Sequence, residues 1–364
     1  MALRAEPSLA QTFSGKNVLI TGNTGFKGSW LTIWLEQLGA NISGFSNNKK
    51  TRPSMFEDLK IEKQIRQIYG DIADRDSLLK AIKSVEPDFI FHLAAQSIVS
   101  ESYLNPLETI RTNSLGTASL LDVMIELKFG GVAVMITSDK CYENDERKSG
   151  YRETDRLGGR DPYSASKAAA EIFLSTYIRS FFEDSSQQQI GIARAGNVIG
   201  GGDWNPNRIV VDCAKAWLDG GKVMLRNPAA TRPWQHVLEP LSGYLRLAQE
   251  LSVNQKMHGQ AFNFGPIESS VYTVSEIVDK LGKSWGHKDL SSHIDFSKDK
   301  IMHEASLLSL NCEKAARELA WFPRLNIDEC LTLVADWYLQ YKRNTKNLYE
   351  ITLEQIKYYE SKAS

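Results

Sequence analysis

The chain has 364 residues, of which 42% are hydrophobic, and a formal net charge of −1. A chain of this length can bury a large core and form one large domain or two. The balanced charge gives no general attraction to nucleic acid, and no apolar stretch of about 18 residues predicts a membrane span. The four cysteines lack C-x-x-C spacing and the six histidines lack metal-ligand spacing. We therefore expect a soluble cytoplasmic protein without a metal site.

The first structured segment follows a loosely patterned extension over residues 1–14. An apolar run at 17–20 predicts a buried strand, and an apolar helix is expected at 29–39. The glycines between them are spaced G-x-x-G-x-x-G, which allows a tight turn and close approach of a pyrophosphate. The amino end of the helix would then bind the phosphates. The candidate cofactor-binding residues of this segment are Gly22, Thr24, Gly25, Phe26, Lys27 and Gly28.

Strand and helix patterns continue to alternate until about residue 200, which predicts a parallel, doubly wound sheet. Strands are expected at 41–45, in a segment that ends at 69–72, at 89–96 and at 132–137. Ligands of such sheets bind at the carboxyl ends of the strands. One carboxylate there would accept a hydrogen bond from the adenine amine, and small side chains would let a cofactor lie across the strand ends. These candidate cofactor contacts are Asp71 for the adenine, then Ile72, Leu93, Ala94, Ala95 and Gln96.

The loop after the second strand leaves the choice of dinucleotide open. It contains no carboxylate that could hold the adenosine ribose, although such a residue often follows this strand. Asn47 or Ser46 could bind the ribose instead. Lys49, Lys50 and Arg52 could meet a 2′-phosphate, so these residues alone do not separate NAD from NADP.

Two segments carry the candidate catalytic residues. Tyr163 and Lys167 lie four residues apart on a predicted helix, so they share one face. The ammonium of Lys167 would favour the phenolate of Tyr163, whose ordinary pKa is about 10, and allow it to act as a base near neutral pH. Ser138 and Asp139, at the end of the fifth strand, would supply a hydrogen-bond donor and a proton carrier, and Lys140 follows them directly.

The sequence changes character after residue 200, where loops rich in glycine and proline alternate with helices. We interpret 15–200 as a Rossmann-type domain that binds the dinucleotide. Residues 201–364 are interpreted as a smaller mixed α/β portion that mainly binds substrate and can exchange segments with the first domain. Three loop arginines and two tryptophans fit a grip on a nucleotide diphosphate, although loop packing and surface charge are the alternative. These residues are Arg208, Arg226, Arg232, Trp204 and Trp234, of which the arginines and Trp234 are the candidate substrate contacts.

Segments along nearly the whole chain resemble the extended short-chain dehydrogenase/reductase family. The resemblance is carried by residues 21–28, 92–96, 137–142, 163–167 and 193–200. Within that family, a closer resemblance to the CDP-glucose 4,6-dehydratases comes from the runs at 25–31, 138–144, 200–204 and 232–237. The resemblance implies NAD as cofactor and a nucleotide sugar, CDP-glucose, as substrate.

The implied reaction is a redox-neutral elimination that gives CDP-4-keto-6-deoxy-D-glucose and water. Tyr163, held by Lys167, would take the O4 proton while C4 gives a hydride to NAD. A base would then remove the C5 proton, Asp139 would protonate the C6 hydroxyl, and the hydride would return to C6. Ser138, or Thr137 beside it, would polarise the C4 oxygen. Lys140 stands where related dTDP-glucose dehydratases have a glutamate, so it is either the C5 base or a charge anchor.

The resemblance also implies further contacts and a cellular role. Asn197 and His236 would contact the substrate. Helices near 107–128 and 163–182 would pair two copies into a homodimer. The product would be a precursor of deoxy-sugars for a surface polysaccharide such as lipopolysaccharide.

Two alternatives remain on the residues alone. An epimerase or a simple reductase on the same fold would keep Tyr163 and Lys167 without needing Asp139 or Lys140. A non-catalytic NAD-binding regulator would need only the cofactor site. The presence of all four side chains favours the dehydratase.

Overall fold

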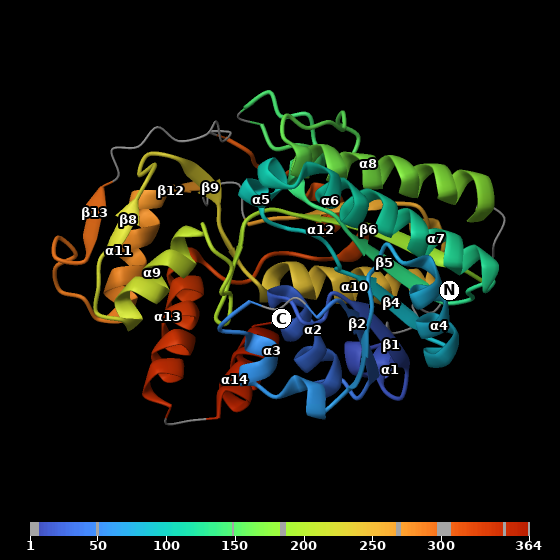
Figure 1. Ribbon diagram of the computed structural model, residues 1–364, viewed down its shortest axis with the longest axis horizontal. Coiled ribbons are helices and arrows are strands. Elements are labelled where there is room, and N and C mark those ends of the chain that lie inside the picture. The colour runs from blue at the N-terminus through green and yellow to red at the C-terminus, as the bar shows by residue number, and fades with distance from the viewer. Residues whose placement is uncertain are drawn as a thin grey trace.

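A seven-stranded sheet, in which every neighbouring pair of strands is parallel, forms the centre of the molecule (Figure 1). The computed structural model describes residues 7–48, 51–147, 149–182, 187–266, 271–296, 307–344 and 347–362. In spatial order the strands are β11 (Ala261–Phe264), β6 (Gln189–Ala195), β5 (Val132–Ile136), β4 (Phe89–His92), β1 (Asn17–Thr21), β2 (Asn41–Ser46) and β3 (Arg66–Tyr69). This sheet confirms the predicted doubly wound α/β class.

The strand order reverses between β1 and β4. From β1 the chain adds β2 and β3 on one side and then returns to place β4 on the other side. Thr21 at the end of β1 lies beside His92 at the end of β4. In open parallel sheets, ligands bind in the crevice outside the carboxyl ends at such a reversal. The topology therefore places a binding site above Thr21 and His92.

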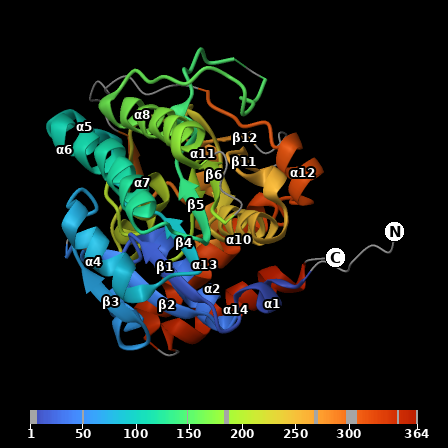
Figure 2. The ribbon, with the colours of Figure 1, turned by 90° about the vertical axis from the view of Figure 1, so that its right-hand side faces the viewer.

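Helices cover both faces of the sheet, as Figure 2 shows. One face is packed by α4 (Arg75–Val85), α7 (Gly116–Glu126) and α8 (Pro162–Tyr177), whose apolar side chains form one buried cluster with the strands. The other face is packed by α2 (Phe26–Gln37) and α10 (Leu238–Val253), with α14 (Leu348–Ser361) outside α2. The central strands are thus buried on both faces, which explains their nearly continuous apolar sequences.

The helix after the glycine-rich turn, α2, begins at Phe26, three residues earlier than the sequence predicts. Gly25 is its N-cap in an extended conformation, so the helix starts directly after the second glycine of the motif. Gly28 lies inside the first turn, where an added Cβ would stand 2.3 Å from the carbonyl oxygen of Gly22. Gly28 therefore allows the close packing of helix and turn that the motif predicts.

The fourth strand is shorter than predicted, because it ends at His92 rather than at Gln96. The backbone N–H of Leu93 still donates to the Thr21 carbonyl at 3.0 Å, but that of Ala94 donates to the Thr21 hydroxyl at 3.2 Å. This side-chain contact turns the chain away from the sheet. The small residues that follow therefore cross the end of β1 as a loop.

The carboxy-terminal half contributes to both parts of the molecule. Its strand β11 belongs to the central sheet, and its helix α10 belongs to the layer that covers the sheet. The division of the chain at residue 200 stays a prediction. The rest forms a smaller lobe from three short strand pairs and three packed helices. These elements are β7 (Val198–Ile199) with β10 (Gln235–His236), β8 (Val223–Leu225) with β13 (Ile294–Phe296), β9 (Thr231–Pro233) with β12 (Val271–Thr273), and α9 (Ile209–Leu218), α11 (Val274–Trp285) and α13 (Ile327–Arg343).

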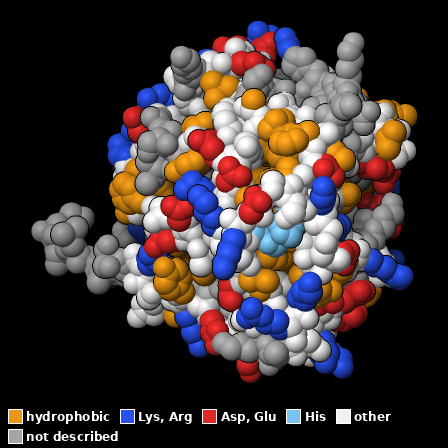
Figure 3. Space-filling model, turned by 90° about the vertical axis from the view of Figure 1, so that its left-hand side faces the viewer, with side chains coloured by type: hydrophobic (Ala, Val, Ile, Leu, Met, Phe, Trp, Pro, Cys, Tyr) orange, Lys and Arg blue, Asp and Glu red, His pale blue; other side chains and the backbone are white. Residues whose placement is uncertain are grey.

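Shorter helices complete the described chain: α1 (Leu9–Phe13), α3 (Met55–Asp58), α5 (Val99–Leu104), α6 (Pro106–Ile110) and α12 (Glu313–Leu319). On the face shown in Figure 3, charged side chains of both signs are interspersed with apolar ones. Every helix in the described ranges is too short or too polar to cross a bilayer. Within the same ranges, no group of three or more His, Cys, Asp or Glu side chains is arranged to hold a metal ion.

Candidate active site

A cavity of about 890 Å³ lies at the carboxyl ends of the central strands, and loops of the smaller lobe form part of its wall. This volume is in the range of cofactor and substrate pockets. The cavity is lined by all the predicted catalytic residues, which are Ser138, Asp139, Lys140, Tyr163 and Lys167. The predicted cofactor contacts that line it are Gly22, Thr24, Gly25, Phe26, Lys27, Gly28, Asn47, Asp71, Ile72, Leu93, Ala94 and Ala95. The predicted substrate contacts that line it are Asn197, Arg208, Arg226, Arg232 and Trp234.

The structure does not bring Gln96 or His236 into this cavity. The side-chain amide of Gln96 donates to the Ile98 carbonyl at 3.0 Å and to the Thr109 hydroxyl at 2.9 Å, so it braces its own loop. His236 is fully buried, with its ring 5.8 Å from that of Trp30. The resemblance implies a substrate contact for His236, and in one regular strand Trp234 and His236 would point to the same side. Here β9 ends at Pro233 and β10 begins at Gln235, so the extended run is interrupted at Trp234 and the two side chains point differently.

The glycine-rich turn fits a dinucleotide pyrophosphate. Gly22 has a φ of 74° and lies so close to the next loop that an added Cβ would stand 2.7 Å from the Ala94 backbone. Gly25, the N-cap of α2, offers no side-chain acceptor, so no side chain caps the first N–H groups of that helix. Those donors and the helix dipole make the turn an anion site at the edge of the cavity.

The predicted adenine end of the site is only partly defined. Asn47 lines the cavity, whereas Lys49 and Lys50 lie outside the described residues. Asp71 lines the cavity too, but its carboxylate accepts a hydrogen bond from Arg111 at 2.8 Å and one from the Ala73 backbone at 2.9 Å. A role for Asp71 toward adenine would therefore involve a carboxylate that already holds two donors.

Tyr163 and Lys167 are placed by the start of α8. Asp161 caps this helix by accepting from the Ser164 backbone N–H at 2.9 Å, and Pro162 occupies its first turn. Both predicted catalytic side chains are buried at the cavity wall, and the ammonium of Lys167 donates to the Ile136 carbonyl at 3.4 Å. The helix therefore presents both groups to the end of β5.

The electrostatics of Tyr163 differ from the prediction. Burial raises the pKa of Tyr163 to about 12, and the Ser138 hydroxyl only partly opposes this shift. Burial also lowers the pKa of Lys167 to about 8. Desolvation disfavours the charged forms of both groups, so burial opposes the phenolate that the sequence predicts near neutral pH.

Asp139 lies in a tight turn after β5. Ser138 caps the 3-10 turn Asp139–Cys141, and its hydroxyl donates to the Asp139 carboxylate at 3.0 Å. Burial raises the pKa of Asp139, although the charges of Lys140 and Lys27 and the Ser138 hydrogen bond oppose the shift. A raised pKa favours the protonated carboxyl, which is the form that a proton donor needs.

Close packing holds Asp139 against the end of β6. An added Cβ on Gly196 would stand 2.9 Å from a carboxylate oxygen of Asp139 and 3.7 Å from the ring of Pro233. The Asp139 carboxyl thus lies against the backbone between β6 and β7, close to strand β9. Gly196 is the residue whose missing side chain makes room for the carboxyl there.

Lys27 is a further basic group in the cavity. The sequence predicts it only as a cofactor contact of the glycine-rich turn. Its ammonium donates to the Tyr244 hydroxyl at 3.3 Å. Burial, together with the charge of Arg208, lowers the pKa of Lys27 to about 7, and the charge of Asp139 partly opposes this shift. Lys27 can therefore exchange a proton near neutral pH.

The three predicted phosphate-binding arginines differ in their partners. Arg208 pairs with the buried carboxylate of Asp203 at 2.7 Å, and Arg226 pairs with Asp212 at 3.2 Å. Arg232 donates to the carbonyl of Thr231 at 2.7 Å. The role of Asp203 was not predicted, although the residue stands in the glycine-rich run before Arg208.

Sequence reasoning also missed a buried ion pair directly below the catalytic residues. Glu171, two helical turns after Tyr163, pairs with Arg194 of β6, and both side chains are at most 5% exposed. The signal was available for Glu171, because a carboxylate eight residues after Tyr163 lies on the same helix face. Its partner could not be deduced, because the contact joins residues far apart in the sequence.

Comparisons with known proteins agree with this geometry. A sequence profile of the family described as GDP-mannose 4,6 dehydratase matches residues 19–334. The CDP-glucose 4,6-dehydratase of Salmonella typhimurium is 42% identical over 330 residues, which cover 90% of this chain and 91% of that protein. A dTDP-glucose 4,6-dehydratase of Streptomyces antibioticus is 29% identical over 88% of this chain and 92% of its own length.

Solved structures show how widely the fold is shared. The dTDP-glucose 4,6-dehydratase of Streptomyces venezuelae, crystallised with NAD, superposes with a TM-score of 0.77 at 24% identity, covering 91% of this chain and 99% of its own. The UDP-glucose 4-epimerase of Thermotoga maritima gives a TM-score of 0.74 at 21% identity, over 89% and 99% of the two chains. Because dehydratases and epimerases superpose almost equally well, the fold does not separate the two activities. The profile match over most of the sequence and the relative at 42% identity do show the family, and the chain belongs to the nucleotide-sugar 4,6-dehydratases of the extended short-chain dehydrogenase/reductase family.

Proposed function

We propose that this protein is an NAD-dependent CDP-glucose 4,6-dehydratase, a hydro-lyase that forms CDP-4-keto-6-deoxy-D-glucose and water. The observation that carries the proposal is that one cavity holds both Tyr163 with Lys167 and the buried carboxyl of Asp139. An oxidation and reduction at C4 needs only the first pair, whereas loss of water also needs a proton donor for the C6 hydroxyl. The 42% identity to a CDP-glucose 4,6-dehydratase supports the choice of nucleotide.

The glycine-rich turn and the small residues after β4 would hold NAD. Bound NAD would accept the C4 hydride of the sugar and return it to C6. Tyr163 would take the O4 proton, and Ser138, which lines the same cavity, would bind the same oxygen. Because burial keeps the pKa of Tyr163 near 12, the phenolate needs added positive charge, which is the charge that oxidised nicotinamide carries.

Asp139 would donate its proton to the C6 hydroxyl as water leaves. Burial favours its protonated form, and Ser138 fixes the direction of the carboxyl. The C5 proton, made acidic by the 4-ketone, requires a separate base. Lys140 is the predicted base, and Lys27 is a second candidate because it lines the same cavity and has its pKa lowered to about 7.

The substrate diphosphate would lie against the loops of the smaller lobe. Arg232 and Arg226 line the cavity there, and the ring of Trp234 is fixed by a hydrogen bond from its Nε1 to the Tyr272 carbonyl at 3.2 Å. Asn197, after β6, would contact the sugar. These residues support recognition of a nucleotide diphosphate by charge and stacking.

A reaction assay separates this proposal from its alternatives. The protein is incubated with CDP-glucose and NAD, and products are followed by mass spectrometry and absorbance. A dehydratase forms a product lighter by one water without net NADH. A dehydrogenase accumulates NADH, an epimerase forms an isomer of unchanged mass, and a regulator forms no product. The same assay with dTDP-glucose and UDP-glucose tests whether the enzyme selects the cytidine nucleotide.

We also propose a homodimer through α6, α7 and α8. These helices pack on one another, and they carry several exposed apolar side chains on and next to them: Leu104, Leu107, Ile110, Leu115, Ile172 and Phe181. Covering such a surface favours association. Sedimentation of the wild type and of Leu107→Glu tests this. A monomeric wild type would exclude the dimer.

We place the reaction in the cytoplasm, as a step toward deoxy-sugars of a surface polysaccharide. The four cysteines are free thiols, with Cys141, Cys213 and Cys330 buried, as is usual in a reducing compartment. Fractionation of cells that make the native protein would test the location.

A further inference from the structure

The buried ion pair below the catalytic residues joins the helix and the strands that carry the site. Arg194 donates from Nε to one Glu171 carboxylate oxygen at 2.7 Å, and its Nη2 pairs with the other oxygen. This bidentate contact fixes the relative orientation of the guanidinium and carboxylate planes. A buried ion pair is weak evidence for stability, because desolvation offsets much of the attraction. Its place in the fold therefore points to a different use.

Glu171 also binds the segment that carries Asp139. The Thr137 hydroxyl donates to the Glu171 carboxylate at 2.5 Å, and Thr137 directly precedes Ser138 and Asp139. On α8, Glu171 lies one turn after Lys167, on the same helix face. One carboxylate thus connects the helix of the proton acceptor with the strand end of the proton donor.

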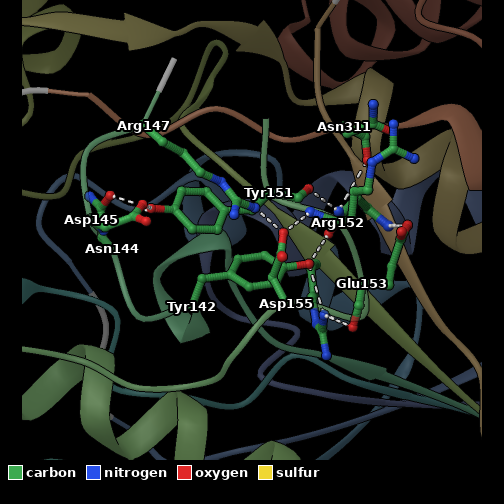
Figure 4. A network of polar contacts seen from close by, with 11 residues as sticks. Tyr142, Asn144, Asp145, Arg147, Tyr151, Arg152, Glu153, Asp155 and Asn311 are labelled. Atoms are coloured by element: carbon green, nitrogen blue, oxygen red, sulfur yellow. Dashed lines mark hydrogen bonds and ion pairs between the residues drawn. The ribbon is translucent and has the colours of Figure 1, made fainter. Parts of the chain in front are cut away.

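Arg194 extends the connection to the far end of the same loop. Its Nη1 donates to the Tyr142 hydroxyl at 2.7 Å and to the Glu153 carbonyl at 3.1 Å. The Tyr142 hydroxyl in turn donates to the Asn263 side chain at 2.7 Å. Figure 4 shows Tyr142 in this network, with its ring stacked on that of Tyr151 at 5.2 Å. The loop that holds Asp139 is therefore bound on both sides by the ion pair.

We propose that Glu171 and Arg194 are positioning residues, which hold Tyr163 and Lys167 in register with Ser138 and Asp139 and keep a negative charge one helical turn from Lys167. This inference rests on the proposed roles of Tyr163 and Lys167. It adds that the geometry and the charge state of the two are set by a pair that itself does not line the cavity.

The charge effect has a definite sign. Burial lowers the pKa of Lys167 to about 8, and the Glu171 carboxylate opposes that shift. Cys141 faces Lys167 as well, but burial raises its thiol pKa, so it stays neutral. His92 of β4 has a pKa lowered to about 3 by burial and is neutral too, whereas Lys27 of α2 has a pKa near 7 and titrates nearby.

Removing the charge of Glu171 should therefore lower the pKa of Lys167. The ammonium would then be lost at a lower pH, and the alkaline limb of C4 oxidation would move down with it. A residue that only supports the fold would reduce the rate without moving this limb. The Lys27 titration is common to the wild type and all variants, so it does not produce a difference between them.

The test compares Glu171→Gln with Glu171→Asp, which keeps the charge on a shorter side chain. Lys167 is titrated by NMR of ¹³C-labelled lysine in protein without NAD or sugar, with Lys167→Arg to assign its signal. We expect a lower Lys167 pKa in Glu171→Gln and an unchanged one in Glu171→Asp. Single-turnover C4 oxidation should be about 10- to 100-fold slower in both, because both disturb the register. NAD affinity should stay within about twofold in both.

An unchanged Lys167 pKa in folded Glu171→Gln, with wild-type oxidation, would overturn the proposal. Should that variant not fold, Thr137→Val, at a residue that also lines the cavity, removes the hydrogen bond from the end of β5 to Glu171 and leaves the ion pair intact. It should slow oxidation while leaving the Lys167 pKa unchanged, and wild-type oxidation by it would count equally against the proposal. The titration needs no substrate, so a wild type that fails to dehydrate CDP-glucose would reject the proposed function while the role of Glu171 is still decided.

Discussion

The two walls of the cavity are built differently. Tyr163 and Lys167 stand on a 16-residue helix, and Asp139 stands at the end of a central strand, with buried hydrogen bonds behind them. On the opposite wall, Arg208 and Arg226 stand in or next to loops, and their charges are already paired with Asp203 and Asp212. The catalytic wall is thus preorganised, which is what a reaction that develops charge requires.

This difference indicates that the two walls have different roles in the reaction. Groups that move protons are fixed by regular elements, where a shift of about 1 Å would be costly for the rate. Two of the groups proposed to bind the diphosphate, Arg208 and Arg226, have carboxylate partners that compensate their charge. Variants of the first wall should therefore act on rate constants, and variants of the second wall on substrate affinity.

The largest effect is expected for Tyr163→Phe. This change removes the acceptor of the O4 proton while keeping the ring, so C4 oxidation should fall by about 10²- to 10⁴-fold. NAD affinity, measured by fluorescence quenching, should stay close to that of the wild type. Turnover at the wild-type rate would remove Tyr163 from the chemistry.

Asp139→Asn should separate oxidation from elimination. The amide cannot protonate the C6 hydroxyl, so hydride transfer from C4 should proceed and water loss should slow by about 10²- to 10³-fold. In a single turnover, absorbance at the NADH band should rise and persist, whereas the wild type returns to baseline. Elimination at the normal rate in this variant would place the acid elsewhere.

The C5 base is decided by comparing Lys140→Met with Lys27→Met. If Lys140 is the base, its variant should oxidise C4 but exchange the C5 hydrogen with deuterated solvent at least about 10²-fold more slowly. If Lys27 is the base, the same loss should appear in Lys27→Met instead. Mass spectrometry of recovered substrate and product measures the exchange. Rapid exchange of the C5 hydrogen in one variant excludes the substituted lysine as the C5 base.

Much of this site could be predicted from the sequence, for a physical reason. Gly22, Tyr163 and Asp139 belong to short segments in which local geometry and chemistry are linked, such as a turn that needs glycine or two residues on one helix face. The sheet places the ends of those segments together, so predicting the fold also located these residues.

The remaining features depend on tertiary contacts. Burial raises the pKa of Tyr163 to about 12, the opposite direction to that predicted from its neighbour Lys167. Glu171 and Arg194 meet only because α8 packs beside β6. His236 points into the core although Trp234, two residues earlier, lines the cavity. Local sequence patterns do not predict these features. They depend on desolvation, on pairing between distant segments, and on the side-chain direction in an irregular segment.

The smallest expected effect concerns the binding wall and tests whether it acts on affinity alone. Arg232 lines the cavity, and its guanidinium donates to the Thr231 carbonyl at 2.7 Å. A charge-assisted contact with a diphosphate contributes about 2 to 3 kcal/mol, so Arg232→Ala should raise KM about 30- to 150-fold. NAD affinity and the single-turnover rate at saturating substrate should change little, because Tyr163 and Asp139 are held by other elements.

Arg226→Ala is the matched control on the same wall. Its guanidinium is nearly half exposed and is shared with Asp212 at 3.2 Å, so solvent and a carboxylate already compensate much of its charge. Its removal should raise KM less than that of Arg232. Equal KM values for wild type and Arg232→Ala would return Arg232 to a surface role. A fall in rate without a change in KM would instead break the division between the two walls, because a binding residue would then be setting the geometry of the reaction.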